Sequence, residues 1–172
     1  VSEEGLASRT QAGIYDDCFI PMLTSLTDRI HREGGLVFAQ LHHAGRLQGV
    51  GTTVLPAVGA SHLTAPGKAE NVHALTGEEV RTVIHKFVKA AERAKQAGVD
   101  GVEIHGAHGY LLAQFLSKGV NKRVDEYGGS VTNRARIVCE MICAVKAACG
   151  NDFPVCVRTS GEEGFHGGNS IE

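Results

Sequence analysis

Three short apolar runs, each preceded by a segment with helical periodicity, constrain the fold of this chain more than any other feature. The runs have the length and nearly continuous apolar character of strands that are covered on both faces. Alternating helices and strands favour the α/β class, with parallel strands joined by right-handed crossovers. In chain order, we predict a helix over 16–33, a strand over 36–41, a helix from Thr76 to Gly98, a strand over 99–104, a helix over 130–149 and a strand over 154–158.

The second predicted helix has the clearest boundaries. Thr76 can cap its first turn, and Glu79 follows three residues later, as in a capping box. Leu75 is placed to pack against Val80, and Gly98 is suited to end the helix. The apolar stripe of this helix consists of Val80, Val83, Ile84, Phe87, Ala91 and Ala94, and that of the third helix consists of Val138, Met141, Ile142, Val145 and Ala148.

Residues 42–74 show no sustained hydrophobic period and are rich in glycine, alanine and threonine, with prolines at 56 and 66. We therefore predict a long loop between the first strand and the second helix. Loops of this length in compact domains are often functional.

Each predicted strand has one apolar face and one less apolar face, because side chains alternate along a strand. The apolar faces suit packing against helices. The other faces end in Gln40, His105 and Arg158, at the carboxyl ends of strands, where α/β proteins build their sites. The less apolar faces consist of Leu36, Phe38 and Gln40, of Gly101, Glu103 and His105, and of Cys156 and Arg158.

The second strand runs directly into the sequence His-Gly-Ala-His-Gly-Tyr at 105–110. The two imidazoles there can polarise a carbonyl oxygen, and Tyr110 can donate a proton. The amide of Gln40 and the guanidinium of Arg158 can hold a cofactor beside them. Two alternatives remain open from the residues alone. His105 and His108 could bind a catalytic metal together with Glu103, although no H-E-x-x-H motif occurs. Each polar side chain could also be satisfied structurally, with Arg158 paired to Glu103.

Four stretches of the sequence resemble the old yellow enzyme family of FMN-dependent NAD(P)H oxidoreductases, and within it the bacterial flavin oxidoreductases and 2,4-dienoyl-CoA reductases. The resemblance covers nearly the whole chain and is weakest from Gly49 to Val72. The stretches are QLHHAGR at 40–46, GVEIHGAHGYLL at 101–112, QFLS at 114–117 and NKRVDEYGGS at 121–130.

The resemblance implies a (β/α)8 TIM barrel that binds FMN at the carboxyl ends of its strands. It assigns Gln40 and Arg158 to the flavin, with Arg158 stabilising negative charge on the reduced ring. It assigns His105 and His108 to the carbonyl oxygen of the substrate, and Tyr110 to proton donation. The expected reaction passes hydride from NADH or NADPH through FMN to an activated alkene, such as an enone or a dienoyl thioester.

Other residues of these motifs have no evident chemical role. We expect His42, His43 and Arg46 to anchor a loop. Glu103 needs an ionic partner, because an unpaired buried carboxylate costs several kcal/mol. The turn before the third helix is expected to be held by Arg123, Asp125, Tyr127 and Arg134.

The composition indicates that the binding partner of this chain is a small molecule. The net charge of −2 gives no basic footprint for nucleic acid and no cationic face for a membrane. The five cysteines form no C-x-x-C pair, which suits a reducing compartment, and we expect Cys139 and Cys143 to be buried small side chains. The sequence has no stretch of membrane-spanning length and no signal-peptide pattern at Val1, so we expect a cytoplasmic protein. A homo-oligomer is compatible with the sequence.

The chain is short for the fold it resembles. A barrel of this type needs about 250 residues, and only three of its strands are predicted among these 172 residues. We expect residues 1–172 to form a partial barrel domain that covers the third to fifth βα units. We expect the chain to be a piece of a longer protein, a truncated relative whose activity alone is doubtful, or a non-catalytic half-barrel that pairs with another chain.

Overall fold

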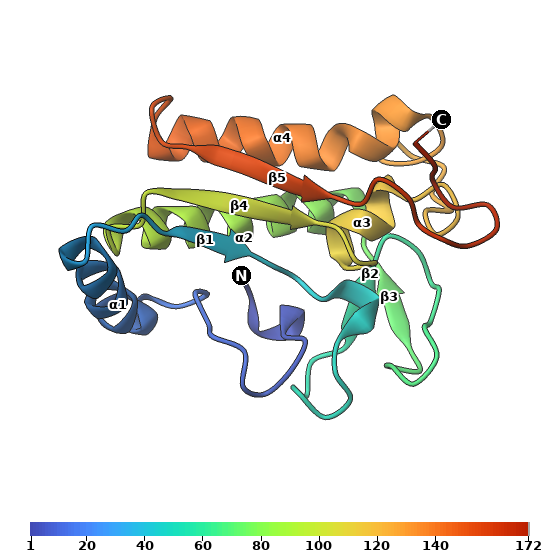
Figure 1. Ribbon diagram of the computed structural model, residues 1–172. Helices are drawn as coiled ribbons and strands as arrows, with labels where there is room; N and C mark the ends of the chain where they lie inside the picture. Colours follow the sequence, from blue (N-terminus) through green and yellow to red (C-terminus); the bar gives the residue numbers. More distant parts are fainter. Residues whose placement is uncertain (172) are drawn as a thin grey trace.

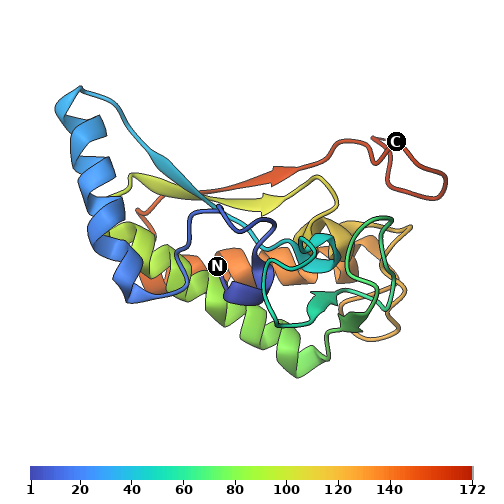
Figure 2. The same cartoon turned by 90° about the horizontal axis from the view of Figure 1, so that it is seen from below.

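The computed structural model describes residues 1–171, which form one layer of helices against a parallel sheet (Figures 1 and 2). Three short 3-10 helices, Glu3–Gly5, Asp17–Phe19 and Gly45–Leu47, lie between the longer elements. The helices and strands are α1 (Ile20–Arg32), β1 (Phe38–Leu41), β2 (Ala57–Gly59), β3 (Val72–Ala74), α2 (Gly77–Gln96), β4 (Gly101–Gly106), α3 (Leu111–Leu116), α4 (Val131–Cys149) and β5 (Val155–Thr159).

The three predicted strands form one parallel sheet in the order β1-β4-β5, which confirms the predicted parallel arrangement. In the register of this sheet, Gln40 lies opposite Glu103, and His105 lies opposite Arg158. The carboxyl ends of the strands therefore bring the polar ends of their less apolar faces together.

Helices α2 and α4 cover one face of the sheet (Figure 2). The predicted stripe of α2 is buried throughout, and Thr76 and Glu79 form the predicted capping box. In α4 the buried side is rotated from the prediction, because Ala148 is exposed whereas Ile137 and Cys149 are buried.

The prediction that Cys139 and Cys143 are buried is wrong. Both thiols are exposed on α4. The buried residues of this helix are Ile137, Val138, Met141, Val145 and Cys149, so its packed side points elsewhere and leaves the two cysteines to solvent.

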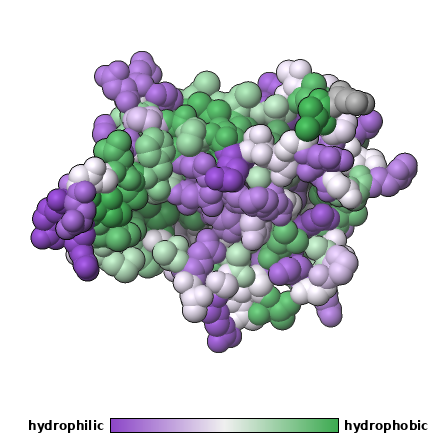
Figure 3. Space-filling model, viewed as in Figure 1, coloured by the Kyte–Doolittle hydropathy of each residue, from purple (hydrophilic) through white to green (hydrophobic). Residues whose placement is uncertain are grey.

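The opposite face of the sheet is open. Leu36 is 78% and Phe38 is 46% exposed, so the prediction that β1 is covered on both faces is wrong for residues 1–171. Figure 3 shows hydrophobic residues gathered over this open face. Two further exposed apolar residues, Met22 and Leu26, extend from the nearby α1.

The predicted long loop contains more structure than expected. Besides a 3-10 turn at Gly45–Leu47, it holds the parallel pair β2–β3, with Ala57 opposite Val72. The sequence prediction also missed α3. Strands of three residues and a helix of six are too short to produce a recognisable hydrophobic period.

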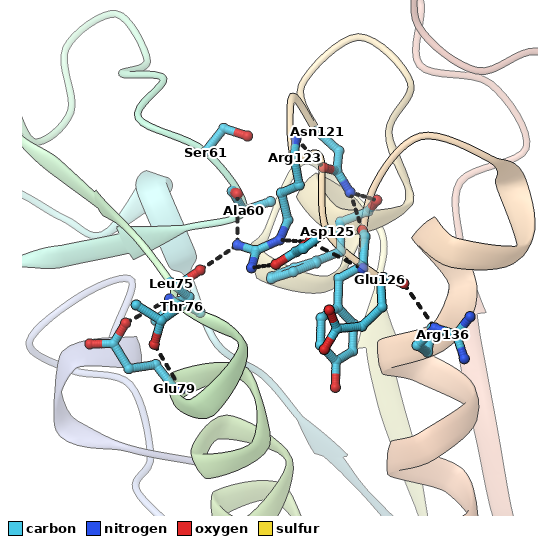
Figure 4. Close-up of polar contacts among 12 residues, drawn as sticks. Ala60, Ser61, Leu75, Thr76, Glu79, Asn121, Arg123, Asp125, Glu126 and Arg136 are labelled. Atoms are coloured by element: carbon cyan, nitrogen blue, oxygen red, sulfur yellow. Dashed lines mark hydrogen bonds and ion pairs between the residues drawn. The ribbon is translucent and has the colours of Figure 1, made fainter.

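Arg123 joins the turn before α4 to the β2–β3 region (Figure 4). Its guanidinium pairs with Asp125 and donates hydrogen bonds to the backbone carbonyls of Ala60 and Leu75. Asn121 supports the same turn by donating to the carbonyl of Tyr127 at 2.8 Å. These contacts agree with the structural role expected for this motif.

Candidate functional site

Glu103 is the shared acceptor of two strand-end side chains. The amide of Gln40 donates to Glu103 Oε1, and Arg158 Nε donates to the same oxygen at 3.0 Å. The hydrogen bond from Gln40, followed by that from Arg158, lowers the pKa of the Glu103 carboxyl and keeps it ionised. The expected ionic partner of Glu103 is therefore Arg158.

His105 and His108 lie together where β4 ends. His105 is buried, with 4% of its surface exposed, and its Nε2 lies 3.3 Å from Nδ1 of the exposed His108. Burial, and then the neighbouring His108, lower the pKa of His105, so its ring is neutral near pH 7. Its Nδ1 is buried without a hydrogen-bond partner among the described residues.

The turn that carries the second histidine is conformationally unusual. His108 has φ 58°, and among the described residues it is the one non-glycine residue with positive φ. Gly109 follows with φ 73°, in the region that glycine favours. Non-glycine residues in this region cost free energy and cluster at functional sites.

Tyr110 ends the turn and precedes α3. Its ring centroid lies 5.4 Å from that of His105 and 4.2 Å from that of His42. The backbone of the next residue holds this position, because Leu111 N–H donates to the carbonyl of His43 at 3.0 Å. The three predicted residues of the site, His105, His108 and Tyr110, are thus brought together.

The expected loop anchor is found at His43. This residue is fully buried, and its Nδ1 accepts a hydrogen bond from Gly45 N–H at 3.0 Å. Arg46 contributes a hydrogen bond to the carbonyl of Thr64 at 3.4 Å. His42 also anchors a loop, because it hydrogen-bonds to Gln11 of the N-terminal segment, and its ring packs against the site as well.

Sequence reasoning missed two residues that organise the site. Gln114 is buried, and its amide donates to the carbonyls of Gly109, at 2.8 Å, and of Ala44, at 3.4 Å. It thereby ties the histidine turn to the loop after β1. Gln11 contacts His42 from the N-terminal segment. Gln114 lies in one of the quoted motifs, whereas no pattern marked Gln11.

The imidazoles of His105 and His108 can donate hydrogen bonds to an oxygen of a ligand, and the phenol of Tyr110 can donate a proton. The guanidinium of Arg158 lies beside them. Among residues 1–171, no group of three or more histidine, cysteine, aspartate or glutamate side chains is arranged to hold a metal ion. Glu103 is engaged by Gln40 and Arg158 instead of the histidines. The geometry therefore gives the metal-dependent hydrolase no support.

Comparison with known sequences identifies the family. The profile of the NADH:flavin oxidoreductase / NADH oxidase family matches residues 1–172. The chain belongs to this family. The resemblance to old yellow enzymes is therefore confirmed.

Individual relatives of this NADH:flavin oxidoreductase family member support the same assignment. The chain is 42% identical over 163 residues to an NADH oxidase of Thermoanaerobacter brockii, covering 94% of this chain and 25% of the relative. It is 41% identical over 174 residues to an NADPH dehydrogenase of Listeria monocytogenes serotype 4b, covering 100% of this chain and 49% of the relative. The chain thus spans between a quarter and half of these relatives.

A solved structure shows the same likeness. The old yellow enzyme homologue from Zymomonas mobilis superposes with a TM-score of 0.88 at 34% identity, covering 98% of this chain and 50% of that one. With the parallel sheet seen here, this likeness confirms the α/β barrel class. Over residues 1–171, no helix is long and apolar enough to cross a membrane.

Proposed function

We propose that the protein carrying this chain is an FMN-dependent NAD(P)H oxidoreductase of the ene-reductase type. The observation that carries the proposal is the His105–His108–Tyr110 cluster at the carboxyl edge of the sheet, next to Gln40 and Arg158. The names of the relatives, an NADH oxidase and an NADPH dehydrogenase, support a nicotinamide nucleotide as the reductant.

The strand-end residues fit a flavin. Glu103 fixes Gln40 and Arg158 on one open face, and the terminal nitrogens of Arg158 form no hydrogen bond with the described residues. They are free to donate to the heteroatoms of a planar ring, and the positive charge suits an anionic reduced ring. Bound FMN would supply hydride transfer, which no side chain of this chain can perform.

His105 and His108 would hold the activated alkene. Because His105 is neutral, the nitrogen that carries its proton can donate a hydrogen bond to a carbonyl or thioester oxygen. Its buried Nδ1 has no partner among residues 1–171, so no hydrogen bond from the described residues to this atom fixes which nitrogen carries the proton. Polarising the oxygen draws electron density from the double bond and prepares the β carbon to accept hydride.

Tyr110 would complete the reduction by transferring its phenolic proton to the α carbon. One hydride and one proton then add across the double bond, the nicotinamide nucleotide is oxidised, and solvent restores the phenol. The substrate class is a small activated alkene, such as an enone or a dienoyl thioester.

The barrel position also belongs to this proposal. We assign residues 1–172 to the third to fifth βα units of the barrel, as a partial FMN-binding domain. Three parallel strands with both outer edges unpaired among the described residues support a partial barrel with further units on either side, and the position third to fifth is what the resemblance implies. The remaining units would supply the further flavin contacts.

The test separates the two half-reactions in the FMN-loaded protein. Flavin reduction by NADH or NADPH is followed anaerobically by absorbance, and reoxidation by 2-cyclohexenone is followed after mixing. Tyr110→Phe should slow reoxidation on the order of 10²-fold, the usual contribution of a general acid, and leave flavin reduction within about twofold. A wild-type protein that binds no FMN, or whose reduced flavin ignores the enone, would refute the proposal.

A further inference from the structure

Gln11 and His42 form a hydrogen-bonded pair that the proposed reaction does not use. Gln11 Nε2 lies 3.0 Å from His42 Nδ1, and the pair joins the N-terminal segment to the residue that follows β1. His42 is half-buried, and its Nε2 is buried without a partner among residues 1–171.

The pair fixes the tautomer of His42. Gln11 Oε1 accepts a hydrogen bond from Ala7 N–H at 2.8 Å, which sets the orientation of the carboxamide. The amide nitrogen of Gln11 can only donate, so His42 Nδ1 must accept. A neutral His42 therefore carries its proton on Nε2.

His42 is neutral at ordinary pH. Burial, and then the neighbouring His105, lower the pKa of His42 to about 4. Near pH 7, His42 is therefore uncharged and carries its proton on Nε2.

This imidazole packs against the phenol of Tyr110. The two ring centroids lie 4.2 Å apart with an interplanar angle of 86°, the edge-to-face geometry that aromatic pairs favour. The ring of His105 lies farther from that of Tyr110, at 5.4 Å between centroids. Packing against His42 is thus the closest ring contact of Tyr110 among the described residues.

We propose that Gln11 and His42 are positioning residues for Tyr110, with Gln11 orienting the imidazole and the imidazole holding the phenol at the edge of the site. The pair acts through Tyr110, and its effect on turnover rests on the proposed ene-reductase function. The orientation itself is a property of this chain.

The first test reads the orientation without turnover. In the protein labelled with ¹⁵N-histidine, long-range ¹H–¹⁵N spectra should report His42 protonated at Nε2 near pH 7. Gln11→Glu keeps the shape but offers an acceptor in place of the donor, and it should move the proton to Nδ1 or charge the ring. A wild-type His42 protonated at Nδ1 would overturn the proposal.

The second test reads the phenol. The chain has three tyrosines, so 3-fluorotyrosine labelling gives three ¹⁹F signals, and Tyr110→Phe identifies one of them. His42→Ala should shift and broaden the Tyr110 signal, whereas His42→Phe, which keeps a ring in place, should restore a narrow line. His85→Ala, at an exposed histidine of α2, is the matched control. An unchanged Tyr110 signal in His42→Ala would also overturn the proposal.

The third test asks whether the position matters for turnover. With FMN bound, His42→Ala should slow alkene-dependent reoxidation at least about tenfold, while flavin reduction by NAD(P)H and reoxidation by ferricyanide, which needs no proton donor, stay unchanged. His42→Phe should recover most of the loss. Equal slowing of all three steps would indicate damage to the fold and refute positioning. If the wild-type protein reduces no alkene, the proposed function fails, while the two spectroscopic tests still decide the orientation.

Discussion

At the scale of single residues, Arg158 gives the most direct test of the flavin assignment. Its removal deletes a charged hydrogen-bond donor, which contributes about 1.5–3 kcal/mol. We expect Arg158→Ala to weaken FMN binding about tenfold to about a hundredfold, measured by quenching of flavin fluorescence. Arg29→Ala, at an exposed arginine of α1, should leave affinity unchanged. Equal affinity in wild type and Arg158→Ala would contradict the assignment.

The convergence of Gln40, His105 and Arg158 could be predicted from the sequence, because strand alternation and parallel pairing follow local rules. The pairing of Glu103 with Arg158 could also be predicted from the sequence. The contact of Gln11 with His42 was not, because it joins residues 31 positions apart through irregular backbone. Hydrogen bonds of that kind leave no periodic signal in a sequence.

At the scale of elements, the capping box of α2 makes stability depend on pH. The backbone N–H of Thr76, and then His73, lower the pKa of Glu79 from 4.5 to about 2. Because the folded-state pKa is depressed, Glu79 stabilises the fold above about pH 4.5, and this stabilisation is lost as the pH falls toward 2. Glu79→Gln keeps an acceptor for the cap but cannot titrate.

Urea unfolding of the wild type and of Glu79→Gln at pH 7 and pH 3 measures what the Glu79 charge contributes to the free energy of unfolding. The wild type should be the more stable protein at pH 7, and the difference should shrink at pH 3. A difference that is the same at both pH values would contradict the role of the Glu79 charge.

Long elements with caps were predictable, and short ones were not. The sequence located α2 well because its cap and stripe agree, and it located β4 only within two residues, since apolar character begins before the paired strand. The pair β2–β3 and helix α3 depend on tertiary contacts, such as the close approach of Gly59 to Val72 and Gln114. Local propensity cannot reveal contacts of that kind.

At the scale of the whole molecule, the open face of the sheet distinguishes this chain from a closed barrel. Its apolar end carries Leu36 and Phe38, both exposed, and its carboxyl end carries the candidate site. The outer edges of β1 and β5 have no neighbouring strand in the part of the chain that the structure describes. Unpaired edges beside an apolar face promote association between chains.

Residues 1–172 produced alone should therefore bind the dye ANS, with raised fluorescence, and should self-associate in sedimentation velocity. Phe38→Lys places a charge on the open apolar face of the sheet and should reduce both signals. Val124→Lys, at a fully exposed residue of the turn before α4, should change neither. Adding a polypeptide with the remaining barrel units of a relative should suppress ANS binding by the wild type, because those units would cover the open face. A wild-type chain that binds no ANS and stays monomeric would mean that this face is protected in another way.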